Sequence, residues 1–397
     1  MIKWVKNITI IAGATLMVSA CSSVDSENEM AELPIFEATY QPHIAWTQHV
    51  GNGIEHYYSQ LQPAVDETAV YSAARDGSVK ALAVKSGKVL WSTHLHAQQD
   101  NAGLHLSARV SGGIGLGDGT LFIGTENAEV YALNTRDGKV KWSTTVSGEV
   151  LAQPVYDNGL VVIHTSRDDL IALDSNDGKQ IWRLSHSQPN LTLRGNATPS
   201  IAQGGIIYGR SDGYIAVALL ADGQSGWQLP VARAYGATEL ERLVDVDMQP
   251  VILNNIVYAL AYNGNLVAIE LLSGRELWSQ KYSGFNNISV NGQDIFLTDY
   301  RGYIFAVNRD NGEQRWVNKQ LSYRNVTGVT VANQYLVVGD EEGYLHWLDR
   351  FTGQFVAQQD LDEGGLYKEP VATATHLYLQ TRDGEIIAIE KPIVNVE

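Results

Sequence analysis

The chain has 397 residues, and its 44 acidic side chains outnumber 28 Lys and Arg, which gives a formal net charge of −16. A negative charge of this size repels nucleic-acid phosphates, and the sequence contains no basic run that could form a separate patch, so nucleic acid is not expected as a partner. Cys21 is the only cysteine, which excludes an intramolecular disulfide and every mechanism that needs two cysteines.

The first residues have the composition of a secretory signal. Lys3 and Lys6 precede an apolar run, residues 8–16, that is too short to span a bilayer. The small residues directly before Cys21, in "VSAC", resemble the bacterial lipobox, in which the cysteine is lipidated and becomes the mature N-terminus. We therefore predict a signal peptide over residues 1–20 and lipidation at Cys21.

The residues after the cysteine indicate a tether. Ser22 stands where lipoproteins kept at the inner membrane carry Asp, so the resemblance implies an outer-membrane lipoprotein that faces the periplasm. Residues 22–40 contain five acidic residues and few large apolar ones, a composition that cannot bury enough surface to fold alone. We expect residues 21–40 to form a lipidated acidic tether and residues 41–397 to form a single domain.

A repeated unit fills the rest of the chain. Its most visible part is a turn Gly that follows Ser, Asp, Asn or Thr, with a Trp four residues later. Gly at such a position supplies the positive φ that a tight β-hairpin turn requires. The pairs are Gly87 and Trp91, Gly138 and Trp142, Gly178 and Trp182, Gly223 and Trp227, Gly274 and Trp278, and Gly312 and Trp316, and a seventh copy has Gly353 but Ala357.

Each unit also has an earlier turn. We place these turns at Gly77, Ala128, Asp169, Gly213, Gly264, Gly302, Gly343 and Gly384. Two strand-like runs precede each of them, as in residues 153–165, so one unit has the size and content of a four-stranded propeller blade. There are eight of these earlier turns but only seven of the Gly turns described above. The last unit lacks its Gly turn because only one strand, residues 385–390, follows Gly384.

The N-terminal stretch 43–49 supplies the missing strand, since it carries Trp46 with no turn before it. Pairing this stretch with residues 385–390 would close the ring and remove an exposed sheet edge. We therefore predict an all-β fold: an eight-bladed β-propeller of four-stranded antiparallel blades, closed by an N-terminal strand that completes the last blade.

The Trp motif has two interpretations, a structural repeat and a cofactor-docking element. Stretches such as residues 172–182, "ALDSNDGKQIW", resemble the repeat of the pyrroloquinoline-quinone alcohol dehydrogenases. A cofactor site is expected once per molecule, whereas this motif occurs once per blade, so we assign the indoles to the fold. On an outermost strand they can fill the roughly 10 Å gap between sheets. Small residues six before the turn Gly, such as Ala81, would leave room for a neighbour's ring.

Other candidate sites are weaker. The glycine-rich residues 112–120 precede a strand and no helix, so we interpret them as a crowded innermost strand and not as a phosphate-binding loop. His94, His96 and His105 could supply zinc ligands, but no acidic partner or fixed spacing supports a metal site. The sequence shows no signature of a catalytic triad, so we predict neither an enzyme nor a bound metal or cofactor.

Function is expected where one blade differs from the others. The extra residues of the longer units fall at residues 92–108, 183–198 and 228–249, which share a face with the earlier turns. The last two of these connections combine aliphatic and charged residues.

Leu191 and Leu193 stand beside Arg194, and Asp245 and Asp247 flank a Val. Aliphatic anchors next to a forked cation and paired carboxylates are typical of a docking patch. The alternative is that the leucines pack locally and that Arg194 pairs internally with Asp245 or Asp247.

The whole chain resembles the BamB family of outer-membrane protein assembly factors, lipoproteins of the β-barrel assembly machinery. The resemblance rests on the lipobox, the acidic tether, the repeats with their Trp46 closing strand, and the loop motifs "LTLRG" and "DVDMQP". It implies a non-catalytic scaffold that binds the periplasmic POTRA domains of BamA, supports insertion of outer-membrane proteins and contacts them while unfolded. Carried over by motif, the implied contacts are Leu191, Leu193, Arg194, Asp245 and Asp247.

Two other classes of function stay open at this point. A quinone-dependent dehydrogenase, as that family implies, would need an adjacent cysteine pair and a calcium site of Glu, Asn and Asp, and a single cysteine excludes the pair. A glycan- or peptidoglycan-binding propeller would need exposed aromatic residues on the loop face, for which Tyr235 and Phe285 are candidates.

Overall fold

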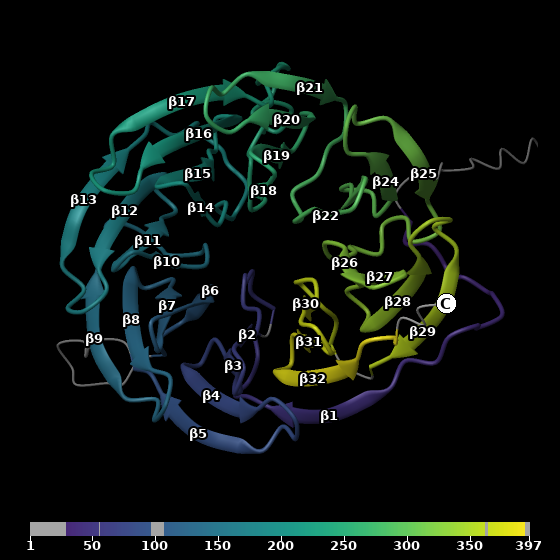
Figure 1. Cartoon of the computed structure of the whole chain (residues 1–397), viewed down its shortest axis with the longest axis horizontal. Helices are drawn as coiled ribbons and strands as arrows, with labels where there is room; N and C mark the ends of the chain where they lie inside the picture. Colours follow the sequence, from purple (N-terminus) through teal and green to yellow (C-terminus); the bar gives the residue numbers. More distant parts are fainter. Residues whose placement is uncertain (1–28, 55, 97–106, 362–363, 394–397) are drawn as a thin grey trace, which may run out of the picture.

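The structure is a computed structural model, and it describes residues 29–54, 56–96, 107–361 and 364–393. The described residues form eight four-stranded antiparallel sheets that are arranged as blades around a central axis (Figure 1). The prediction of an all-β, eight-bladed propeller is therefore confirmed. No helix among these residues is long and apolar enough to cross a membrane.

The blades are numbered in chain order, and their strands are given from the axis outward. Blade 1 has β2 (Ala64–Val65), β3 (Ala69–Ala73), β4 (Ser78–Ala83) and β5 (Val89–His94), blade 2 has β6 (Val110–Gly117), β7 (Thr120–Thr125), β8 (Glu129–Asn134) and β9 (Val140–Thr145), and blade 3 has β10 (Val155–Asp157), β11 (Leu160–His164), β12 (Asp169–Asp174) and β13 (Gln180–Ser185). Blade 4 has β14 (Ser200–Ala202), β15 (Gly205–Gly209), β16 (Tyr214–Leu219) and β17 (Ser225–Pro230), and blade 5 has β18 (Val251–Leu253), β19 (Ile256–Leu260), β20 (Leu266–Glu270) and β21 (Glu276–Gln280). Blade 6 has β22 (Ser289–Asn291), β23 (Asp294–Thr298), β24 (Ile304–Asn308) and β25 (Gln314–Asn318), blade 7 has β26 (Thr330–Ala332), β27 (Tyr335–Gly339), β28 (Tyr344–Asp349) and β29 (Phe355–Asp360), and blade 8 has β30 (Val371–Ala372), β31 (His376–Gln380), β32 (Glu385–Glu390) and β1 (Ile44–His49).

The ring closes through the N-terminal strand, as predicted. β1 is the outermost strand of blade 8 and pairs antiparallel with β32, with Trp46 opposite Ala388. The two strands run side by side at the foot of Figure 1 although they come from opposite ends of the chain. Closure pairs the free edge of β32, which would otherwise be a template for association with other strands.

The Trp side chains on the outermost strands of seven blades join each of these blades to the next one. The indole of Trp182 donates a hydrogen bond to the carbonyl oxygen of Leu220 in blade 4 at 2.9 Å, and its ring covers Gly223, where a Cβ atom would lie 2.6 Å from the ring. The acceptor stands three residues before the turn Gly in every case. The same hydrogen bond is made by Trp46, Trp91, Trp142, Trp227, Trp278 and Trp316.

The alanines six before the turn Gly lie opposite Trp residues. Ala81 is the cross-strand partner of Trp91 in its own blade. The other pairs are Ala132 with Trp142, Ala172 with Trp182, Ala268 with Trp278 and Ala306 with Trp316. In blade 7 the sizes are exchanged, because Trp347 on the third strand faces Ala357 on the fourth. Each pair therefore holds one large and one small side chain.

A tyrosine occupies the seam between blades 7 and 8, where both the outer-strand Trp and the turn Gly are missing. The ring of Tyr40 lies 5.2 Å from that of Trp347 and 4.8 Å from that of Tyr335, measured between centroids. The backbone N–H of Tyr40 also donates to the carbonyl oxygen of Val356 on the outermost strand at 3.1 Å. Aromatic packing thus replaces the indole contact at the one seam where the repeat fails.

The part of the expected tether that the structure describes, residues 29–40, lies against blade 7. Buried Arg324 donates to the carbonyl oxygen of Ala31 at 2.9 Å and to Asp340 at 2.7 Å. The N–H of Ala31 donates to Ser322, which lies in the connection between blades 6 and 7. This segment is therefore fastened at both of its ends, here and at Tyr40.

The glycine-rich stretch forms β6, the innermost strand of blade 2, in agreement with its interpretation from sequence. A Cβ atom on Gly115 would lie 2.1 Å from the carbonyl oxygen of Pro154, and one on Gly117 would lie 2.1 Å from the ring of Tyr156. Both contacts are with the start of blade 3, so glycine is required by the close approach of neighbouring blades near the axis.

One face of the disc, here called the first-turn face, carries the turns between second and third strands and the connections between blades. The N–H of Leu95, just after β5, donates to the carbonyl oxygen of Gly77 at 2.8 Å, so the connection starts on this face. In blade 3 the residue with positive φ is Asp168, at 58°, and Asp169 already belongs to β12. The assignment of this turn to Asp169 is wrong by one residue, since two consecutive Asp give no local distinction.

Candidate partner-binding site

Two connections between neighbouring blades form the candidate site. The first loop, residues 186–199, joins β13 to β14, and the second loop, residues 231–250, joins β17 to β18. They meet where the backbone N–H of Leu193 donates to Oδ1 of Asp245 at 3.0 Å. The fold therefore places the motifs "LTLRG" and "DVDMQP" side by side on the first-turn face.

The exposed part of the second loop is shaped by its own residues. Oγ1 of Thr238 accepts from the N–H of Glu241 at 3.3 Å, and Oε2 of Glu241 accepts from the N–H groups of Thr238 at 3.0 Å and Ala237 at 2.8 Å. This reciprocal pattern is a capping box. The backbone donors lower the pKa of Glu241. The turn presents Leu240 to solvent, with 69% of its surface exposed.

A cleft of about 440 Å³ separates the two loops. Leu191 lines one wall, and the other wall includes Ala234, Glu239, Arg242 and Val244. Leu191 is 40% exposed, whereas Leu193 is half-buried. Exposed leucine on the rim of a cleft with charges of both signs is the composition that protein interfaces use for burial and register.

Arg194 has other neighbours than those considered from the sequence. Half of its side chain is exposed, and its guanidinium lies 3.6 Å from Oε1 of Glu126 and 3.8 Å from Oε2 of Glu149. The interpretation in which Arg194 pairs with Asp245 or Asp247 is therefore wrong. Both distances are long and the guanidinium is half exposed, so these ion pairs contribute little to stability and Arg194 can change partners without a large loss.

Asp245 lies beneath the loops. It is only 1% exposed, and its Oδ2 has no hydrogen-bond partner among the described residues. Burial, with a smaller contribution from the nearby carboxyl of Asp168, raises the pKa of Asp245 to about 6. Burial also raises the pKa of Asp247 well above its ordinary value, with Asp245 adding to the effect. Asp245 is thus placed to hold the main chain of Leu193 and not to meet another molecule.

Sequence reasoning missed a buried polar cluster below the first loop. Asp168 is fully buried, its Oδ1 lies 2.9 Å from Nε2 of His164, and its Oδ2 lies 4.0 Å from Nε of Arg210. Nδ1 of His164 is 3.1 Å from the carbonyl oxygen of Ala197, within the first loop. The signal that could have found the cluster is "RDDL", which departs from the Asp-Gly turn of blade 1.

The candidate metal ligands are partly covered by the structure. The rings of His94 and His96 lie 4.7 Å apart, and Nδ1 of His94 is 3.3 Å from Oγ of Ser78. His105 lies outside the described residues, as do Cys21 and the signal peptide. Within the described part of the chain, no three His, Cys, Asp or Glu side chains are grouped so that they could hold a metal ion.

Comparison with known proteins decides the family. The family model described as outer membrane protein assembly factor BamB matches residues 75–318 and 320–393. A curated relative of that name from Yersinia pestis is 40% identical over 388 residues, which are 96% of this chain and 99% of the relative. Another, from Escherichia coli (strain K12), is 42% identical over 378 residues, which are 94% of this chain and 96% of the relative. The chain belongs to the BamB family.

Solved structures agree with the propeller fold of the BamB family. The crystal structure of BamB from Moraxella catarrhalis superposes with a TM-score of 0.79 at 24% identity, covering 88% of this chain and all of that one. Quinohemoprotein alcohol dehydrogenase from Comamonas testosteroni gives a TM-score of 0.67 at 12% identity, over 88% and 76% of the two chains. The likeness of the repeats to quinoproteins is therefore one of architecture, and BamB membership makes the chain an outer-membrane protein assembly factor.

Proposed function

We propose that the protein is a non-catalytic scaffold lipoprotein of the outer-membrane β-barrel assembly complex, and that its two loops bind the periplasmic POTRA domains of BamA. Membership of the BamB family supports the assembly role. The observation that carries the site is the hydrogen bond from Leu193 to Asp245, because it joins two motifs far apart in sequence into one surface.

The residues of the site have different tasks in this proposal. Leu191 and Arg194 are exposed and contact the partner. Leu193 and Asp247 are half-buried at the base of the surface, and buried Asp245 positions the first loop. An aliphatic anchor beside a planar cation matches the composition of interface hot spots.

The proposed lipid on Cys21 would fix which face meets the membrane. Residues 22–28 span at most about 25 Å when fully extended. Ala31 is bonded to Ser322 on the first-turn face, so the anchor would hold this face close to the bilayer. The two loops would then face domains that emerge from the inner surface of the outer membrane.

The substitution Arg194→Glu tests the proposal. A soluble chain that begins after Cys21 is titrated against isolated POTRA domains by calorimetry, while circular dichroism follows the fold. We expect about tenfold weaker binding with an unchanged spectrum, because a third carboxylate would join Glu126 and Glu149.

The control is Arg136→Glu, which makes the same charge change at an exposed turn on the opposite face. It should bind like the unchanged chain. Equal binding by the Arg194→Glu variant would show that the site is misplaced, and an absence of binding by the unchanged chain would rule out the partner.

A further inference from the structure

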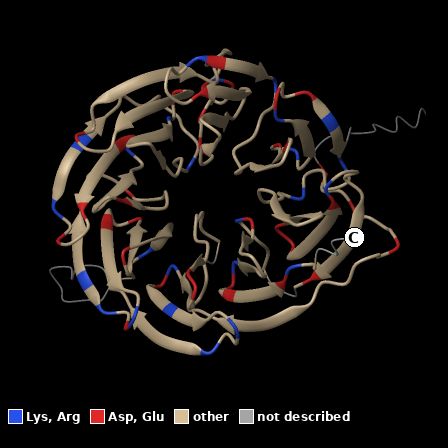
Figure 2. Ribbon diagram, in the orientation of Figure 1, with Lys and Arg blue, Asp and Glu red and all other residues tan. Residues whose placement is uncertain are grey.

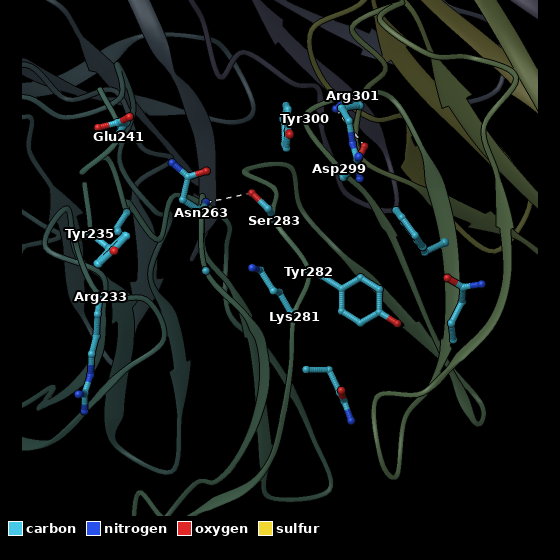
Figure 3. A pocket seen from close by; sticks show the side chains of 15 residues that line it. Arg233, Tyr235, Glu241, Asn263, Lys281, Tyr282, Ser283, Asp299, Tyr300 and Arg301 are labelled. Atoms are coloured by element: carbon cyan, nitrogen blue, oxygen red, sulfur yellow. Dashed lines mark hydrogen bonds and ion pairs between the residues drawn. The ribbon is translucent and has the colours of Figure 1, made fainter. Parts of the chain in front are cut away.

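A second concave surface lies on the other side of the second loop, between blades 5 and 6 (Figure 3). It is a cleft of about 820 Å³. Arg233 and Tyr235 of the second loop form one side, Lys281 follows β21, and Tyr300 and Arg301 lie in the turn between β23 and β24. The proposed partner-binding residues leave this cleft unused.

The cleft is lined by Arg233, Lys281 and Arg301, although the chain has a net charge of −16. Figure 2 shows both signs of charge interspersed around the ring. Arg233 and Lys281 are exposed, and neither forms an ion pair with a residue that the structure describes. Arg301 is held by Asp299 at 2.8 Å, and the carboxylate of Glu241 is occupied by backbone N–H groups. Two cations are therefore free to meet an anionic ligand.

Aromatic rings flank these cations. Tyr235 is 89% exposed, Tyr300 47% and Phe285 44%. The ring centroid of Tyr262 lies 6.4 Å from that of Phe285 and 6.2 Å from that of Tyr300, so these rings form one platform. Arg301 lies 5.4 Å from the ring centroid of Tyr300 and holds the edge of the platform in place.

The apolar part of the lining is out of reach of a ligand. Among the described lining residues, Val244 and Phe305 are the ones with purely hydrocarbon side chains, and they are 3% and 8% exposed. A protein segment binds through exposed apolar anchors seated in pockets, and these two buried side chains cannot offer such a contact. The side-chain amides of Asn263, Gln280 and Gln314 line the cleft instead. This combination of rings, amides and free cations favours a carbohydrate over a peptide.

We propose that this cleft binds a polysaccharide that carries carboxylate groups. The apolar faces of sugar rings would stack on Tyr235 and on the Tyr300 platform, and the amides would hydrogen-bond to hydroxyl groups. The carboxylates would lie against Arg233 and Lys281, the free cations of the cleft. Lys281 and Tyr300 lie outside the two loops of the partner-binding site, so the two sites can be tested separately.

The first test compares three probes by calorimetry on the mature chain. The carboxylated probe is the tetrasaccharide of alternating N-acetylglucosamine and N-acetylmuramic acid with free lactyl carboxylates. The second is the same tetrasaccharide with these carboxylates converted to amides, and the third is a tetraglutamate peptide. We expect the carboxylated sugar to bind about tenfold more tightly than the amide, and the peptide to bind more weakly than either sugar. Tightest binding of the peptide, equal binding of the two sugars, or no binding of the carboxylated sugar overturns the proposal.

The second test uses two exposed positions, so that folding is preserved. Lys281→Gln should weaken binding of the carboxylated sugar about threefold and leave the amidated sugar unaffected, because one exposed charge contact is lost. Tyr235→Ala should weaken both sugars, because stacking does not depend on charge. Lys88→Gln, at an exposed turn of blade 1, is the matched control and should change neither. Unchanged sugar binding by both cleft variants would overturn the site. Lys281→Gln should bind POTRA domains like the unchanged chain, so that a loss of sugar binding can be distinguished from a failure of the partner proposal.

Discussion

The main chain of Leu193 is fixed to Asp245 by a hydrogen bond of 3.0 Å, and the accepting carboxyl is only 1% exposed. The two residues belong to connections that leave different blades. Because a partner cannot reach Asp245, its contribution to the proposed interface is to hold the first loop, with Leu191 and Arg194, in one arrangement. This role predicts effects that differ from those of a surface contact.

Two replacements of Asp245 should distinguish its role in holding the first loop from any role of its negative charge. In Asp245→Asn the amide oxygen can still accept from the N–H of Leu193, so we expect POTRA binding within about twofold of the unchanged chain. Asp245→Leu cannot accept, which frees the first loop, and binding should weaken about tenfold. Calorimetric titration distinguishes the two. Equal losses in both variants would mean that the negative charge itself meets the partner.

The raised pKa of Asp245, about 6, predicts how stability depends on pH. A carboxyl whose pKa is higher in the folded than in the unfolded state holds its proton more tightly when folded, so the free energy of unfolding falls as pH rises from about 4 to above 6. Asp245→Asn removes this ionisation and should be more stable than the unchanged chain at pH 8 by on the order of 2 kcal/mol. Urea unfolding at pH 4 and pH 8 measures the difference. A gain of the same size at pH 4 would contradict the explanation.

Two glycines with similar backbone angles should respond differently to substitution. Gly223 (φ 73°) lies under the ring of Trp182, whereas a Cβ atom on Gly204 (φ 76°) would meet nothing within 4 Å. Gly204→Ala should lower the free energy of unfolding by about 1 kcal/mol, because alanine is strained in the left-handed backbone conformation. Gly223→Ala should lower the free energy of unfolding by about 3 kcal/mol, because the ring of Trp182 must also move. Urea unfolding of both variants tests this, and equal losses would mean that the indole contact is easily displaced.

The seam between blades 7 and 8 should depend on one ring. Tyr40→Ala removes the packing on Trp347 and Tyr335 and should lower the free energy of unfolding by about 2 kcal/mol. Tyr40→Phe keeps the ring and should change it by less than about 0.5 kcal/mol. Limited proteolysis before β1 should be faster in the first variant only. Unaltered stability and cleavage in Tyr40→Ala would show that β1 closes the ring without help from the residues before it.

The regular part of the molecule could be predicted because every blade repeats a local code. A turn Gly with positive φ, short strand-like runs and a Trp at a constant offset are short-range features, and Gly223 and Trp182 are typical of them. The exceptions were harder to predict. Nothing near Tyr40 in the sequence shows that it replaces a missing Trp, because the replaced residue lies in a strand more than three hundred positions away, at Ala357.

By itself the sequence determined the number of blades, the closing strand with Trp46, and which connections are long. Only the tertiary structure decided which side chains of those connections meet, such as Leu193 with Asp245 and Arg194 with Glu126. The physical reason is that pairing within a blade follows from turn type and strand period. Contacts between connections depend instead on how blades are placed around the axis, and that placement appears only when all the blades have packed together.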